Sequence, residues 1–215
     1  MHNSQCTIRN AQFMIKNLIF DFGNVLICYD YPAFVRTIFA DNDELLEFER
    51  VVCNEDFVRR CDLGEESFLE IIRDCQSKFP YWERQLQEFY DRQLEAMTVE
   101  MPGMRNLLTR LRSAGYRLYG LTNWSDAIYP IIEKYDILGM MDDRLISSEE
   151  RMVKPDVAIY DRLCEKFGLV KEECLFTDDR QANIAGARAA GMHAVLFSDA
   201  NQYEKSLREY GITLL

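Results

Sequence analysis

The segment Leu18–Leu26 constrains the fold more than any other part of the chain. Its apolar beginning predicts a buried parallel strand, and Asp21 stands where that strand ends. In open α/β sheets, ligands bind outside the carboxyl ends of the strands, so Asp21 is placed for chemistry. Gly23 follows almost at once and lets the backbone turn tightly or approach a ligand closely. A single aspartate at a strand end is weak evidence, and three further segments strengthen it.

These later segments also place polar groups beside an expected strand end or helix start. They are Thr122 and Asn123 after a strand expected at 116–121, Lys154 before Pro155 and a helix expected at 155–167, and the adjacent Asp178 and Asp179 after a strand expected at 174–177. Proline suits the first position of a helix, because the N–H that it lacks has no partner there. Together the four segments bring a nucleophile, a hydroxyl donor, a cation and two carboxylates to one edge of a sheet.

The second half of the chain alternates between strand and helix patterns. Helices are expected at 104–114, 126–135 and 155–167 and from residue 181, and strands at 116–121, 144–146, 174–177 and 194–197. Such alternation is typical of a parallel sheet with helices on both faces. We therefore predict an α/β fold with a three-layer, Rossmann-like core formed by residues 14–29 and 98–215.

Residues 30–97 differ in character from the rest of the chain. Apolar residues such as Phe34, Val35 and Ile38 recur at helical spacing, and no strand-like alternation appears. We predict a helical insertion after the first strand, which either covers a site or only stabilises the fold. Residues 1–13 are polar and are predicted to form a disordered tail, and Met14, directly before the first strand, is an alternative start.

Composition limits the kinds of partner that the chain can bind. The net charge of −11 argues against a nucleic-acid or anionic-membrane partner, because binding to phosphate backbones requires clustered Lys and Arg. Seven scattered cysteines without a C-x-x-C pair indicate reduced thiols, not a disulfide framework or a zinc site. The chain contains no run of about 18 apolar residues, which a membrane span would need. We expect a cytoplasmic protein that is a monomer or a weak homodimer.

Taken in order, the four segments closely resemble the motifs of the haloacid dehalogenase (HAD) superfamily of hydrolases. The resemblance extends from about Ile15 to Phe197, nearly the whole chain. It implies a Mg²⁺-dependent phosphatase, a phosphoric monoester hydrolase, that acts on a small phosphorylated metabolite through an aspartyl-phosphate. It also implies that the helical insertion is a C1 cap, which covers the active site.

The resemblance assigns a role to each motif residue. Asp21 is the expected nucleophile, and a cation would offset the repulsion between its carboxylate and the phosphate. The other expected roles are phosphate binding by the Thr122 hydroxyl, the Asn123 backbone N–H and Lys154, and metal binding by Asp21, the Gly23 carbonyl, Asp179 and, through water, Asp178. Asn183, one helical turn beyond the acidic pair, is expected to hold that loop. The plainer alternatives are a turn cap for Asp21, helix caps for Asp178 and Asp179, and a surface position for Lys154.

One position departs from the superfamily pattern. Most HAD phosphatases carry a second aspartate two residues after the nucleophile, as general acid and base, and this chain has Gly23 there. Because general acid catalysis is typically worth ~10²–10⁴-fold, simple alkyl phosphates should be poor substrates. The segment from Asp21 to Val25 resembles a branch that includes bacterial α-glucose-1-phosphatases. We therefore favour a sugar phosphate, including sugar-1-phosphates, as the substrate.

The sequence leaves two other functions open. A 2-haloacid dehalogenase would use the same aspartate to attack carbon, but those enzymes need no metal and usually lack an acidic pair such as Asp178 and Asp179. A catalytically inactive HAD-like binding protein would explain Gly23. The presence of Asp21, Thr122, Lys154 and Asp179 argues against that second alternative.

Overall fold

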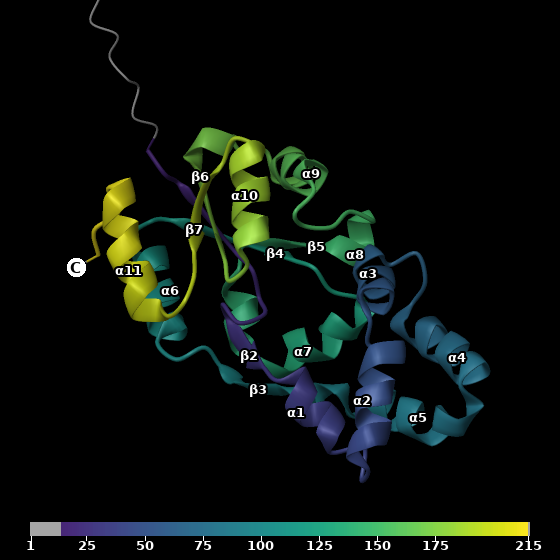
Figure 1. Ribbon diagram of the computed structural model, residues 1–215. Helices are drawn as coiled ribbons and strands as arrows, with labels where there is room; N and C mark the ends of the chain where they lie inside the picture. The colour runs from purple at the N-terminus through teal and green to yellow at the C-terminus, as the bar shows by residue number, and fades with distance from the viewer. Residues whose placement is uncertain (1–13, 215) are drawn as a thin grey trace, which may run out of the picture.

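A five-stranded parallel sheet forms the centre of the computed structural model, which describes residues 14–214 (Figure 1). The strand order is β5-β4-β1-β6-β7. The strands are β1 (Asn17–Phe20), β4 (Arg117–Thr122), β5 (Asp143–Ile146), β6 (Cys174–Asp178) and β7 (His193–Leu196). Because β1 lies between β4 and β6, all four of its residues are buried. Parallel pairing brings the carboxyl ends of all five strands to one edge of the sheet.

Helices cover both faces of this sheet and complete a three-layer α/β fold, as predicted. They are α6 (Met104–Ser113), α9 (Val157–Phe167), α10 (Gln181–Ala189) and α11 (Ala200–Leu207). On one face, the ring of Tyr160 in α9 packs edge-on against Phe176 of β6. On the other face, Tyr203 of α11 packs edge-on against Phe20 of β1. The predicted disordered tail, residues 1–13, lies outside the described residues.

The expected helical insertion is present between two short strands. Strands β2 (Ile27–Tyr29) and β3 (Met97–Glu100) pair antiparallel, and the cap segment, residues 31–96, lies between them. Its helices are α1 (Tyr31–Arg36), α2 (Asn42–Val51), α3 (Glu55–Leu63), α4 (Phe68–Lys78) and α5 (Glu83–Arg92). Aromatic rings are frequent in the interior of this segment, where the ring of Phe48 in α2 contacts those of Trp82, directly before α5, and Phe89 in α5. The β2–β3 pair was not predicted, because three or four residues are too few to show a strand pattern.

Hydrogen bonds from two of its helices, α3 and α4, tie the cap segment to the core. The Phe68 backbone N–H at the start of α4 donates to the Asp126 carboxylate at 2.8 Å. The hydroxyl of Ser147, the first residue of α8 (Ser147–Glu150), donates to the carbonyl oxygen of Asp62 in α3 at 2.6 Å. Helices α3 and α8 also lie next to each other in Figure 1. The cap segment therefore rests on the edge of the sheet where the strands end.

The structure corrects two predicted helices. The helix expected from Pro155 begins at Val157, because residues 153–156 form a turn in which the Asp156 N–H donates to the Val153 carbonyl. The helix expected at 126–135 is a 3₁₀ turn, Asp126–Ile128, followed by α7 (Tyr129–Lys134). The short α8 and the C-terminal α11 were not predicted. Within residues 14–214, no helix has the length and apolar character that crossing a membrane requires.

Candidate active site at the ends of the strands

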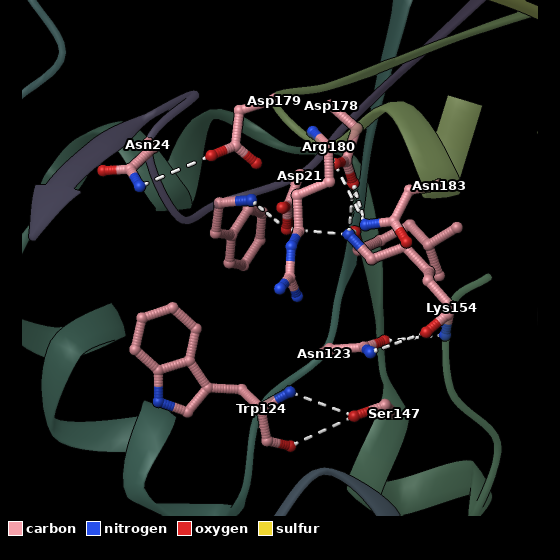
Figure 2. Close-up of polar contacts among 12 residues, drawn as sticks. Asp21, Asn24, Asn123, Trp124, Ser147, Lys154, Asp178, Asp179, Arg180 and Asn183 are labelled. Carbon is pink, nitrogen blue, oxygen red and sulfur yellow. Dashed lines mark hydrogen bonds and ion pairs between the residues drawn. The ribbon is translucent and has the colours of Figure 1, made fainter. Parts of the chain in front are cut away.

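Asp21 lies directly after β1, at the centre of the sheet edge, and only 8% of its surface is exposed. One oxygen of its carboxylate, Oδ1, accepts a hydrogen bond from the Phe22 N–H at 2.7 Å and lies 3.0 Å from the Lys154 Nζ (Figure 2). Burial raises the pKa of the Asp21 carboxyl to about 7, and the Lys154 charge opposes that rise. A buried carboxylate with a single cationic partner has spare capacity for a further cation.

Lys154 is buried with its ammonium between two carboxylates and a carbonyl. Its Nζ lies 2.7 Å from Asp178 Oδ2 and donates to the Leu121 carbonyl at 3.0 Å, in addition to its contact with Asp21. Burial alone would lower the pKa of Lys154, but the two carboxylates raise it above its usual value, so the side chain stays charged. The alternative of an exposed surface lysine is therefore wrong.

Asn123 explains how Lys154 is held in place. Its side-chain amide donates to the Lys154 carbonyl at 3.1 Å, and its side-chain oxygen accepts from the Lys154 N–H at 2.9 Å. These two bonds fix the backbone of the turn before α9, which is why no helix starts at Pro155. The sequence analysis gave Asn123 one role, phosphate binding by its backbone N–H. In the structure its side chain also positions the backbone of Lys154.

Asp178 is completely buried, and both of its carboxylate oxygens have partners. The Asn183 side-chain amide lies 3.0 Å from each oxygen, and the Arg180 N–H donates to Oδ1 at 2.8 Å. Asn183 therefore holds the loop between β6 and α10, as expected. With the Lys154 ion pair as well, Asp178 is better placed to orient the lysine than to bind a metal ion directly.

Asp179, by contrast, is only partly buried and reaches toward the loop after β1. Its Oδ2 lies 3.4 Å from the side-chain amide of Asn24. Asn24 has a left-handed backbone with φ of 53°, a conformation that asparagine tolerates better than most residues. Burial and the neighbouring Asp178 raise the pKa of the Asp179 carboxyl. A cation beside it would offset both effects.

The three aspartates fit a divalent cation. Asp21, Asp178 and Asp179 each present one carboxylate oxygen within 4.8 Å of the others. Oxygen ligands of this kind suit Mg²⁺, which is held in proteins by one or two carboxylates together with phosphate oxygens and water. The Gly23 carbonyl belongs to the tight turn between Phe22 and Ile27, at the same end of β1. Asp21 and Asp179 are the more available carboxylates, because Asp178 is fully buried and both of its oxygens already have hydrogen-bond donors.

Thr122 is the last residue of β4 and is buried beside the same site. It lines a cavity of about 630 Å³ together with Asp21, Asn123, Lys154 and Asp179. The structure therefore brings the predicted phosphate-binding residues to one cavity with the candidate metal ligands Asp21, Gly23 and Asp179. Asp178 lies buried beneath it.

The surroundings of Gly23 show why an acidic side chain is missing there. A Cβ atom at Gly23 would lie 2.7 Å from the ring of Tyr29 and 3.6 Å from the ring of Trp124. Those two rings pack edge-on, with centroids 6.1 Å apart. An aspartate at this position would have to displace Tyr29. Aromatic rings thus occupy the volume beside the glycine, and no titratable side chain can extend from it in this arrangement.

The cavity lies between the strand ends and the cap segment, and its cap side is mainly apolar. The apolar and aromatic lining residues include Tyr31, Val35, Phe57, Phe68 and Phe89. Asp62 of α3 also lines the cavity, and the charges of Lys154 and Arg180 act on its carboxyl. Glu49 and Arg36 also line the cavity.

Sequence reasoning missed four contributors to this site: Tyr29, Asp62, Trp124 and Arg180. Trp124 and Arg180 directly follow predicted motif residues, so their positions alone could have marked them. Asp62 sits among many charged residues of a helix and carries no such signal. Its place is visible only once α3 is packed against the core.

Comparisons with known proteins identify the family of this chain. A family model described as haloacid dehalogenase-like hydrolase matches residues 15–191. The glyceraldehyde 3-phosphate phosphatase of Pyrococcus abyssi is 27% identical over 86% of this chain and 82% of its own. The phosphoglycolate phosphatase of Nitrosospira multiformis is 29% identical over 61% of this chain and 56% of its own. The HAD family enzyme bt-2542 of Bacteroides thetaiotaomicron, solved with magnesium and inorganic phosphate, has a TM-score of 0.71 at 20% identity and covers 86% of this chain and 96% of its own. The chain belongs to the haloacid dehalogenase-like hydrolases.

Proposed function

We propose that the protein is a Mg²⁺-dependent phosphatase that hydrolyses a small phosphorylated metabolite through an aspartyl-phosphate. The observation that carries this proposal is the buried contact between Asp21 and Lys154, with Asp178 and Asp179 beside it, at the floor of a cavity. The names of two relatives, a glyceraldehyde 3-phosphate phosphatase and a phosphoglycolate phosphatase, support the same reaction.

In this proposal Asp21 attacks phosphorus, and Lys154 and the phosphate-binding groups reduce the repulsion between the two anions. The Thr122 hydroxyl and the Asn123 N–H hold the phosphate at the end of β4. Asp21, the Gly23 carbonyl and Asp179 would hold Mg²⁺, with Asp178 contributing through water. The bound ion would supply further neutralisation of charge as the phosphoryl group is transferred. The contacts of Phe22, Asn123 and Asn183 keep the reacting side chains oriented.

We further propose that residues 14–29 and 98–215 form the catalytic core and residues 30–97 a C1 cap. The cap segment supports this division, because it begins and ends at the paired strands β2 and β3 and closes the cavity from the side opposite the strand ends. The similarity of the Asp21–Val25 segment to α-glucose-1-phosphatases supports sugar phosphates, including sugar-1-phosphates, as substrates.

A second substrate class is favoured by the cavity itself. A sugar presents several hydroxyl groups, each of which needs a polar partner when it is buried. The cap side of the cavity instead presents Tyr31, Val35, Phe57, Phe68 and Phe89. This lining suits the phosphate ester of an apolar or aromatic alcohol, whose burial would be driven by the hydrophobic effect.

Phosphate release from a panel of esters, with and without EDTA, tests the proposal. The panel includes α-glucose-1-phosphate, glucose-6-phosphate, acetyl phosphate, phenyl phosphate and a prenyl phosphate. We expect turnover that EDTA abolishes and added Mg²⁺ restores. Halide release from a 2-haloacid that survives EDTA would instead identify a dehalogenase. Binding of phosphate esters without turnover of any of them would identify an inactive binding protein.

A further inference from the structure

Phosphoryl transfer places the attacking and leaving oxygens roughly in line on opposite sides of phosphorus. Asp21 attacks from the end of β1, so the leaving oxygen must face the cap segment. A proton donor for that oxygen must therefore line the same cavity. Gly23 offers no side chain, and Tyr29 fills the space beside it.

Asp62 lies on that side of the cavity. It is in the last turn of α3 and lines the same cavity as Asp21 and Lys154. Its backbone is fixed by a relay of hydrogen bonds from the core, because its carbonyl accepts from Ser147 Oγ at 2.6 Å. The same hydroxyl oxygen accepts from the Trp124 N–H at 3.0 Å, and Trp124 follows the phosphate-binding residues (Figure 2).

Gly64 fixes the end of α3 that carries Asp62. Its φ of 62° is left-handed, and a Cβ atom there would lie 2.4 Å from both the Cβ and the carbonyl oxygen of Ser148. Only glycine allows this approach, so the last turn of α3 packs directly on the first turn of α8. Asp62 is thus held by the core even though it belongs to the cap segment.

The charged and titratable groups around Asp62 come from three sides. Lys154 and Arg180 of the core act on its carboxyl, Tyr31 of α1 lies near it, and Cys61 precedes it. Burial raises the pKa of Asp62 to about 6, and the two positive charges oppose that rise. A carboxyl that titrates close to neutral pH can both donate and accept a proton during turnover.

We propose that Asp62 is the general acid and base of the reaction, delivered by the cap segment in place of the acidic side chain that Gly23 lacks. In the first step the Asp21 carboxylate forms a bond to phosphorus, the bond from phosphorus to the ester oxygen breaks, and Asp62 gives its proton to that oxygen. In the second step Asp62 takes a proton from water as the water oxygen attacks phosphorus. The Asp21–phosphorus bond breaks, and inorganic phosphate leaves.

This inference rests on the proposed phosphatase function, and it changes the substrate range expected from the sequence. If Gly23 left the site without any general acid, alkyl phosphates would be poor substrates. With Asp62 as the acid, the wild-type protein should hydrolyse alkyl phosphates as well as esters of good leaving groups. Loss of Asp62 should restore the strong dependence on the leaving group.

The test compares Asp62→Asn with wild type in the first turnover, using p-nitrophenyl phosphate and n-hexyl phosphate with Mg²⁺. We expect alcohol release from hexyl phosphate to fall by about 10²–10⁴-fold in the variant. Release of p-nitrophenol should change by less than about threefold, because that leaving group needs little protonation. It should appear as a burst followed by slow turnover, since the aspartyl-phosphate lacks a base for its hydrolysis. Equal losses with both esters would overturn the proposal and leave Asp62 a purely structural role.

Two further variants complete the design. Asp56→Asn removes an exposed carboxylate from the same helix, outside the cavity, and should leave both first-turnover rates unchanged. Asp21→Asn should release neither alcohol, because it lacks the nucleophile. If the wild-type protein turned over no ester at all, the phosphatase function itself would be refuted, and not only the role of Asp62. If Asp62→Asn does not fold, Asp62→Glu keeps the acid and shifts it by one methylene. The rate of Asp62→Glu should then depend on the leaving group more strongly than that of wild type. A dependence equal to that of wild type would count against the proposal.

The pH profile gives an independent readout. In wild type, the first-turnover rate with hexyl phosphate should fall as pH rises above about 6, because the acid form of Asp62 is lost. In Asp62→Asn this decline should be absent. A decline that persists unchanged in the variant would assign the proton donor to another group.

Discussion

The two sides of the cavity are built differently. At the strand ends, Asp21, Lys154 and Asp178 are buried together, and each has hydrogen bonds or ion pairs that fix its orientation. The cap side consists mainly of aromatic and aliphatic side chains, with Asp62 placed near the catalytic end. A dense polar network thus holds the side chains at the strand ends, whereas most side chains on the cap side offer non-directional apolar contacts. Under the proposed function, the strand ends would supply the nucleophile and the phosphate-binding groups, and the cap side would select the substrate and supply Asp62.

The largest contrast between the two sides should appear in catalysis. Asp21→Asn removes the nucleophile, so kcat should fall by on the order of 10⁴-fold or more with every substrate. Phe57→Ala enlarges the cap side and should change KM for apolar esters while leaving the reaction itself intact. Steady-state kinetics on phenyl phosphate and glucose-6-phosphate would show this. Comparable losses of kcat in both variants would contradict the division of roles.

Removing a buried charge should reduce the stability of the protein more than removing an exposed one. Lys154→Met leaves Asp21 and Asp178 buried without their cation, so the free energy of unfolding should fall by about 3–5 kcal/mol. Lys78→Met, which removes an exposed ion pair with Asp74 in the cap segment, should cost less than about 1 kcal/mol. Urea unfolding of both variants measures the difference. Equal losses would mean that the buried network contributes no more than a surface pair.

Two glycines with nearly the same backbone conformation test how the cap segment is held. Gly64 and Gly168 both end helices, with φ of 62° and 65°, but only Gly64 faces a close neighbour. Gly64→Ala should therefore cost roughly 3 kcal/mol of unfolding free energy, through backbone strain and the clash with Ser148. Gly168→Ala should cost about 1 kcal/mol, from backbone strain alone. Similar losses in thermal unfolding would argue against a tight contact between α3 and α8.

The pH dependence of stability that Asp62 contributes is expected to be smaller than the effects of Lys154→Met and Gly64→Ala. Burial raises its pKa from 3.8 to about 6, so the folded state holds the proton more tightly than the unfolded state. Its contribution to stability is therefore present below about pH 4 and is lost as pH rises through about 6. Relative to wild type, Asp62→Asn should gain about 2 kcal/mol in unfolding free energy between about pH 4 and pH 7. Urea unfolding at several pH values measures this, and a constant difference would contradict it.

The α/β core could be predicted because its signals are local. Each of Asp21, Thr122 and Asp179 comes at or directly after the end of a buried strand, and parallel strands bring their carboxyl ends to one edge. Chain order and strand ends therefore sufficed to gather the candidate site. The prediction was wrong at the start of α9, because the side chain of Asn123 fixes the backbone of Lys154 across 31 positions of sequence.

The sequence by itself thus determined the fold class, the helical insertion and the residues at the strand ends. Only the tertiary structure decided what faces them. Tyr29 fills the space beside Gly23, and Asp62 reaches the catalytic cavity because Gly64 lets α3 pack against α8. The physical reason is that side chains of the cap segment converge from separate helices. Their meeting depends on helix packing, which no short stretch of sequence encodes.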